Sequence, residues 1–213
     1  MGTGEIITMS IFGLLVLAGL TASIYQGAKQ RRQVAAYSSS RGYTLLKFND
    51  PRLAALLDLV SPNTDWSPHT VLLVEPPPRA IYLFGTLFNS KRSRSKASTA
   101  FACLVEHTSH RPEHPVSVFT RIPGGDFLIS NRIEAGSDDF QRQFSFTGDD
   151  AASAQAALTP AVQSILLEHA TAPGWNLTVD IAAKAIVAQS HWALSDDEWD
   201  YLVNLARKLR AAL

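Results

Sequence analysis

An uncharged stretch near the N-terminus limits the folds open to this chain more than any other feature. No charged side chain occurs from Ile6 to Ala28. A helix that rises about 1.5 Å per residue needs roughly 20 residues to cross a hydrocarbon core of about 30 Å, and Ile6–Tyr25 meets that length. The sequence therefore predicts a transmembrane anchor within residues 1–28, which contacts the lipid bilayer through Ile6–Tyr25.

Two other interpretations of this stretch fit the residues less well. A cleaved signal peptide starts with basic residues and ends at a small-residue cleavage site, whereas the only charged side chain before Ile6 is that of Glu5. A buried core helix rarely stays uncharged on every face over such a length. We therefore interpret the stretch as a single membrane-spanning helix.

The charges that flank the predicted span give it a direction. Lys29, Arg31 and Arg32 follow the span, while no basic side chain precedes it. Because basic residues collect on the cytoplasmic side of a membrane, we expect a single-pass protein of the cell membrane. Its N-terminus would be outside and its C-terminal domain cytoplasmic. Gly19 and Ser23 would let two such helices approach closely, which is compatible with a homodimer.

Residues 42–213 have the patterns of a soluble α+β domain, joined to the anchor by a basic juxtamembrane linker over residues 29–41. Apolar side chains alternate with polar ones in several short runs that are bounded by proline, glycine or charge, as in an antiparallel meander. We expect a mostly antiparallel sheet with two or three packed helices. The expected strands are Tyr43–Phe48, Val71–Val74, Ile81–Phe88, Thr99–Glu106, Val116–Ile122, Phe127–Ile129, Phe144–Phe146 and a closing hairpin of Asn176–Val179 with Ala185–Gln189.

Capping patterns mark the expected helices. Asp50–Pro51 combines a capping side chain with a proline in the first turn, and so begins a short helix. Asp149–Asp150 precedes a long helix that we expect over residues 151–170. Ser195–Glu198 is a capping box that begins the last helix, and its acidic side chains are explained by the cap and the helix dipole, without a metal.

Charge and cysteine content exclude several classes of function. The 19 basic and 19 acidic residues cancel, and no aromatic stacking platform accompanies them, so no nucleic-acid partner is expected. The single cysteine, Cys103, permits neither an internal disulfide nor a C-x-x-C metal pair. It lies in phase with Phe101 and Val105 along a strand, which indicates a buried structural thiol. Phosphate-loop, serine-hydrolase and kinase motifs are absent, and no cofactor is expected.

One stretch, from about Asp138 to Val187, resembles a known family. Its motif reads Phe140-x-x-x-Phe144, Asp150-x-x-x-Ala154, Leu158-Thr159-Pro160 and Ile165-Leu166-Leu167. This motif is similar to that of a bacterial family of single-pass membrane-anchored proteins of unknown function, in which a strand carries paired phenylalanines and the following helix contains a Leu-Thr-Pro step. The resemblance implies a similar α+β domain on a tether and no catalytic residues. Because proline lacks a donor amide, a bend near Ala156 is expected.

Three histidines form the first candidate site. His107, His110 and His114 lie with two carboxylates in the loop between two expected strands, and imidazole and carboxylate groups are ligands of zinc and other transition metals. Their spacing matches no zinc signature, H-E-x-x-H is absent, and Arg111 would repel a cation. A polar hairpin loop is therefore the competing interpretation.

A basic loop forms the second candidate site. Its cations could contact anionic headgroups together with Lys29, Arg31 and Arg32, since a cation near a charged leaflet contributes about 1 kcal/mol. An ordinary solvated loop is the alternative. The loop residues are Lys91, Arg92, Arg94 and Lys96.

We expect from these features a non-enzymatic, membrane-tethered cytoplasmic module that binds an unidentified protein partner or the membrane surface. The alternative from a different class is a metal-dependent enzyme or metal sensor that uses His107, His110 and His114. A third option is an envelope enzyme with an unrecognised site on the opposite side of the membrane.

Overall fold

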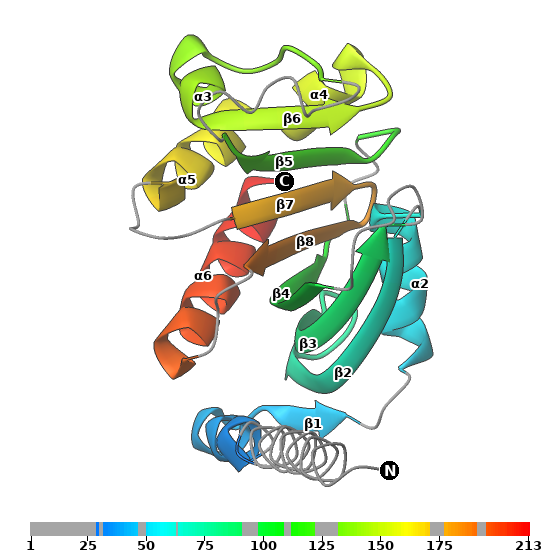
Figure 1. Ribbon diagram of the computed structural model, residues 1–213, viewed down its shortest axis with the longest axis vertical. Helices are drawn as coiled ribbons and strands as arrows, with labels where there is room; N and C mark the ends of the chain where they lie inside the picture. The colour runs from blue at the N-terminus through cyan, green and yellow to red at the C-terminus, as the bar shows by residue number, and fades with distance from the viewer. Residues whose placement is uncertain are drawn as a thin grey trace, which may run out of the picture. The chain divides into compact units, whose positions relative to one another are not determined.

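The computed structural model describes Lys29 and residues 32–46, 50–62, 64–90, 98–108, 112–121, 132–170, 177–190 and 195–213 (Figure 1). The chain divides into two compact units, Met1–Gly42 and Tyr43–Leu213. In the first unit, residues 32–41 are helical. The Arg41 guanidinium lies 5.9 Å from the centroid of the Tyr37 ring, one helical turn away. The helix thus continues through three serines that the sequence places in a linker.

The predicted anchor, Ile6–Tyr25, lies outside the described residues. Within the ranges that the structure describes, no helix combines the length and the apolar character needed to cross a bilayer. The anchor and its orientation therefore stay predictions.

The second unit contains one eight-stranded sheet, in which every pairing is antiparallel. The strand order is β1-β2-β3-β4-β8-β7-β5-β6 (Figure 1). This confirms the predicted α+β class. The strands are β1 (Thr44–Leu46), β2 (Thr64–Glu75), β3 (Ile81–Ser90), β4 (Ser98–Glu106), β5 (Val116–Thr120), β6 (Phe144–Gly148), β7 (Leu177–Ala182) and β8 (Ala185–Ser190).

The predicted meander is only partly correct. Strands β2, β3 and β4 pair in sequence order, but β4 then pairs with β8 and not with β5. The β7–β8 hairpin, which was expected to close the sheet, lies at its centre and joins β4 to β5. Turn residues indicate only which neighbouring strands form hairpins. No local sequence pattern therefore predicts the pairing of β4 with β8. The expected strand at Phe127–Ile129 lies outside the described residues.

Strand β2 is longer than the expected run at Val71–Val74, because an irregularity interrupts its alternation. The register shifts between His69 and Val71, where Thr70 has a φ of 56°. His69 lies opposite Gly85 of β3, and a Cβ atom at Gly85 would be only 2.8 Å from His69 Nε2. A residue with a side chain at position 85 would therefore displace the imidazole.

Five helices are described in this unit. The predicted caps are confirmed for two of them: the Asp50 carboxylate accepts hydrogen bonds from the amides of Arg52 and Leu53, and Ser195 and Glu198 form the reciprocal capping box. The helix that Asp50 caps buries its predicted apolar face. The helices are α2 (Pro51–Val60), α3 (Asp138–Gln143), α4 (Ala151–Ala157), α5 (Pro160–Ala170) and α6 (Asp196–Ala212).

The long helix predicted over residues 151–170 is wrong, since the chain forms two helices there. Asp150 caps α4 as expected, through a 2.6 Å bond from the Ser153 amide. The helix ends at Ala157, and α5 begins at Pro160 with the Thr159 hydroxyl accepting from the Val162 amide at 3.3 Å. The proline lacks an amide and Thr159 supplies a new cap, so the expected bend is a complete break.

The paired phenylalanines also differ from the expectation. Phe140 belongs to α3, a helix that the sequence did not predict, and only Phe144 lies in a strand. The Phe140 ring stacks on those of Phe144 and Phe146, with centroids 4.8 and 5.9 Å apart. Six residues are too few for a helical period to be recognised, although Ser137 caps α3 in the usual way.

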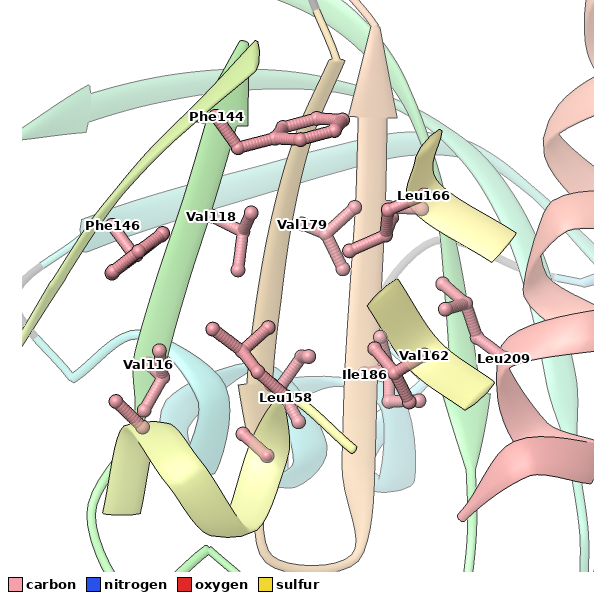
Figure 2. Close-up of a cluster of buried hydrophobic side chains, with 14 of the residues drawn as sticks. Val116, Val118, Phe144, Phe146, Leu158, Val162, Leu166, Val179, Ile186 and Leu209 are labelled. Atoms are coloured by element: carbon pink, nitrogen blue, oxygen red, sulfur yellow. The ribbon is translucent and has the colours of Figure 1, made fainter. Parts of the chain in front are cut away.

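The two faces of the sheet carry different helices. Helices α3, α4, α5 and α6 bury their apolar side chains on one face, here called the four-helix face, and α2 packs on the other, the α2 face. Figure 2 shows the cluster on the four-helix face, which includes Val116, Val118, Phe144, Phe146, Leu158, Val162, Leu166, Val179, Ile186 and Leu209. The cluster under α2 includes Leu53, Leu57, Tyr82, Phe84, Leu104, Ala182 and Val187.

Replacement of Phe140 by alanine tests the stacked cluster. Phe140 is fully buried, so Phe140→Ala should lower the free energy of unfolding by about 3–5 kcal/mol. Leu59→Ala is the matched control, because this leucine is 49% exposed and its loss should change stability by no more than about 0.5 kcal/mol. Chemical denaturation of the full chain in a non-ionic detergent measures both, and equal losses would contradict the packing described.

Candidate functional site

The predicted histidine cluster is only partly within the described residues. His107 is buried, with its Nε2 atom 3.0 Å from the Ala182 carbonyl oxygen. Burial lowers the pKa of its imidazole, and nearby backbone carbonyls partly offset this effect. His114 is exposed and donates its amide to the Ser153 hydroxyl at 3.1 Å, whereas His110 lies outside the described residues.

No group of three or more His, Cys, Asp or Glu side chains that could hold a metal is present in the part of the chain that the structure describes. The carboxylate next to the cluster, Glu106, is bound elsewhere. Its two oxygens accept from Arg52 Nη2 at 2.7 and 2.8 Å, which links β4 to the first turn of α2. Metal binding by the three histidines stays a prediction.

The predicted membrane-surface residues are also only partly described. Lys29 and Arg32 are exposed. Arg31 and the basic loop with Lys91, Arg92, Arg94 and Lys96 lie outside the described residues, so headgroup contact stays a prediction. Cys103, by contrast, is fully buried, and burial raises the pKa of its thiol, as expected for a structural cysteine.

A group of polar side chains that the sequence did not predict lies on the α2 face. Successive side chains of a strand point to opposite faces of the sheet. Along β5, β6, β7 and β8, the residues between those on the four-helix face therefore point to the α2 face. Two adjacent rows cross the strands: Thr147–Ser117–Asp180, and Ser145–Phe119–Thr178–Gln189. We call these seven residues the polar strip.

Asp180 is the charged member of the polar strip. It lies on β7 between Val179 and Ile181 and is only 4% exposed. The Ser117 hydroxyl on the neighbouring strand donates to its Oδ1 atom. Burial raises the pKa of the Asp180 carboxyl to about 6, and the Ser117 hydrogen bond opposes this shift. The pKa of this carboxyl therefore lies about two units above the usual value for an aspartate.

Two further members of the strip carry buried polar atoms without a hydrogen-bond partner. These are Gln189 Oε1 and Ser145 Oγ, and the two residues are 7% and 1% exposed. An unsatisfied buried polar atom costs about 1–3 kcal/mol, so native proteins rarely keep one without a reason.

The strip lies beside the apolar cluster under α2, which extends along these strands to Ala182 and Val187. The other described helices pack on the opposite face. Four strip residues are only partly buried, namely Ser117, Phe119, Thr147 and Thr178, whereas the other three, Ser145, Asp180 and Gln189, are buried.

The sequence contained one local signal of the strip. In β7, an aspartate stands between valine and isoleucine in an otherwise apolar run. An aspartate at such a position most often lies on the solvent-exposed face of a strand. The seven side chains come from positions as far apart as Ser117 and Gln189, 72 residues along the chain, and only the register of four strands brings them together.

Comparison with known proteins supports the fold. No family model matches the chain, and no curated protein matches its sequence. Among solved structures, the chain is similar to the crystal structure of the mycobacterial trehalose monomycolate transport factor A, TtfA, with a TM-score of 0.53 and 13% identity. The match covers 85% of this chain and 93% of that one. At this identity, the likeness establishes a shared α+β fold.

The raised pKa of Asp180 predicts a pH-dependent stability. The folded protein holds this proton up to about pH 6, whereas an unfolded aspartate loses it near pH 4. The favourable contribution of Asp180 to the free energy of unfolding is therefore complete below about pH 4. It is lost as the pH rises through about 6, a change on the order of 3 kcal/mol.

Asp180→Asn should remove this contribution while keeping the Ser117 hydrogen bond. The difference in unfolding free energy between wild type and variant should shift in favour of the variant as the pH rises from acid to neutral. Asp58→Asn, at an exposed position on α2, is the control. Denaturation curves at several pH values measure the effect, and an unchanged difference would contradict the assignment.

Proposed function

We propose that this chain is a membrane-tethered binding module without catalytic activity. The polar strip carries the proposal: it groups hydroxyls, one amide, one carboxyl and one aromatic ring on one sheet face, where Ser117, Phe119, Thr147 and Thr178 are partly exposed. Binding sites use such small sets of convergent polar groups beside an aromatic side chain.

The tether is the second part of the proposal. It rests on the uncharged run Ile6–Tyr25 and on the basic residues that follow it. The positive-inside rule favours a cytoplasmic module with the N-terminus outside. The motif over Asp138–Val187 is similar to that of a single-pass membrane-anchored bacterial family, which supports the same organisation.

The fold likeness suggests the kind of process involved. TtfA is named as a trehalose monomycolate transport factor. We extend to this chain the idea of an accessory factor that holds a ligand or a partner protein beside the bilayer. A protein partner, and contact of the basic loop with headgroups, are parts of this proposal.

Membrane fractionation of the full chain tests the tether. The wild type should stay in the membrane pellet after an alkaline carbonate wash. Leu14→Arg combined with Leu17→Arg should release it, because each central charge costs about 2.5–3.5 kcal/mol on insertion. Leu14→Ile with Leu17→Ile keeps the hydropathy and should remain in the pellet. Release of the wild type by carbonate would contradict the proposal.

A C-terminal reporter tests the orientation. Alkaline phosphatase fused after Leu213 should be inactive, since it folds only on the outer side, and a green fluorescent protein fused there should fluoresce. The opposite pair of results would place the module outside and would favour the envelope alternative.

A further inference from the structure

We propose that the end of the sheet that carries the β2–β3 and β7–β8 turns lies against the anionic headgroups of the bilayer in which the chain is anchored. The inference rests on the tether of the proposed function and adds the surface that faces the membrane. It is carried by the point at which the chain enters the second unit and by exposed cations at that end. We call Pro76–Arg79 and Lys184 the tether-side end.

The chain enters the second unit beside the end of β2. Thr44 pairs with Leu73, two residues before β2 ends at Glu75. The Arg207 guanidinium donates to the Tyr43 hydroxyl and to the Glu75 carboxylate. The first residue of this unit is therefore held next to the place where the β2–β3 turn begins.

The link between this entry point and the predicted anchor is short. Residues 29–42 alone separate Tyr43 from the uncharged stretch. Residues 32–41 of this link are helical and rise about 15 Å in all. A link of this length holds the entry point of the second unit close to the surface of the bilayer.

Backbone hydrogen bonds place the two turns at the same end of the sheet. The Glu106 amide donates to the Ala80 carbonyl at 2.8 Å, and the next amide, that of His107, donates to the Lys184 carbonyl at 2.8 Å. The end of β4 thus connects the β2–β3 turn to the β7–β8 turn. The tether-side end is therefore one surface, and the chain enters beside it.

The exposed side chains of the tether-side end are basic and apolar. Pro76, Pro77, Pro78, Arg79 and Lys184 are all exposed. Within the part of the chain that the structure describes, the two cations make no ion pair with an acid. Proline has no amide hydrogen, so the three rings reach a headgroup layer without donors that need water.

The acids beside these cations are bound by other groups. Glu75 binds two arginines of α6, and Glu106 binds Arg52 of α2. The exposed acids Glu113 and Asp149 lie further across the sheet, next to β5 and β6. The exposed cations therefore keep their charge, and a charged leaflet attracts such cations.

The basic loop of the proposed function belongs to the opposite ends of the same strands. It follows Ser90, the last residue of β3, and precedes Ser98, the first residue of β4. The ten residues of β3 span about 30 Å. Contact through the loop and contact through the tether-side end can therefore be tested independently.

Quenching of single fluorescent labels by nitroxide lipids tests the contact in the full chain in nanodiscs. Cys103 is fully buried, so a thiol-reactive fluorophore reports on a cysteine introduced by Pro77→Cys in the tether-side end. Ser67→Cys, at an exposed position near the start of β2, and Ser95→Cys, in the basic loop, are the comparisons. In an equal mixture of phosphatidylglycerol and phosphatidylcholine, we expect the strongest quenching at position 77. In phosphatidylcholine alone, this quenching should fall.

Charge reversal shows whether the cations make the contact. Arg79→Glu and Lys184→Glu, each combined with Pro77→Cys, should lower the equilibrium constant for contact about fivefold or more, the factor that one cation near a charged leaflet contributes. Fluorescence lifetimes measure the quenched fraction. Arg142→Glu, at an exposed position on α3, is the matched control and should leave the quenching unchanged. Arg79→Gln takes the place of Arg79→Glu if that variant does not unfold cooperatively.

Three results would overturn the inference. Stronger quenching at position 67 or 95 than at position 77 would place another part of the unit at the bilayer. Equal quenching at position 77 in the two lipid compositions would exclude anionic headgroups as the partner. Unchanged quenching after both charge reversals would exclude the two cations. Failure of the tether itself is seen separately, as a chain released from membranes by carbonate.

Discussion

The antiparallel pairing of β4 with β8 is the contact on which the rest of this structure depends. It aligns Phe101 with Ser190 and Glu106 with Ala185, and so joins the β1–β4 half of the sheet to the β5–β8 half. Helix α6 packs over this join, where Trp199 contacts Phe101 with ring centroids 4.9 Å apart. Without this pairing, each half would expose a long sheet edge and lose its share of both cores.

Glu75, at the end of β2, binds two arginines near the C-terminal end of α6. Its carboxylate accepts from Arg207 Nε at 2.7 Å and from Arg210 Nη2 at 2.6 Å, and Arg210 also donates to the Arg79 carbonyl at 2.7 Å. Desolvation raises the pKa of Glu75, but the two guanidinium groups outweigh it and lower the pKa overall. These groups are partly exposed, so they orient the helix more than they stabilise it.

The polar strip lies on the face of the sheet that carries fewer of the described helices. Four of the described helices fill the four-helix face with apolar side chains, whereas α2 is the described helix on the other face. Beyond the apolar cluster under α2, the strand positions on that face carry hydroxyls, an amide and a carboxyl. The buried Asp180 has a cost in stability at neutral pH, because burial disfavours its charged form.

The sequence alone determined the features that depend on neighbouring residues. The Asp50 and Ser195 caps, the apolar face of α2 and the burial of Cys103 follow from spacings of one or two turns or strand positions, and the structure confirms them. The central place of β7–β8 and the meeting of Asp180, Ser117 and Gln189 were decided only by tertiary structure. Their physical reason is register: long-range strand pairing depends on how whole faces pack, and no local pattern specifies it.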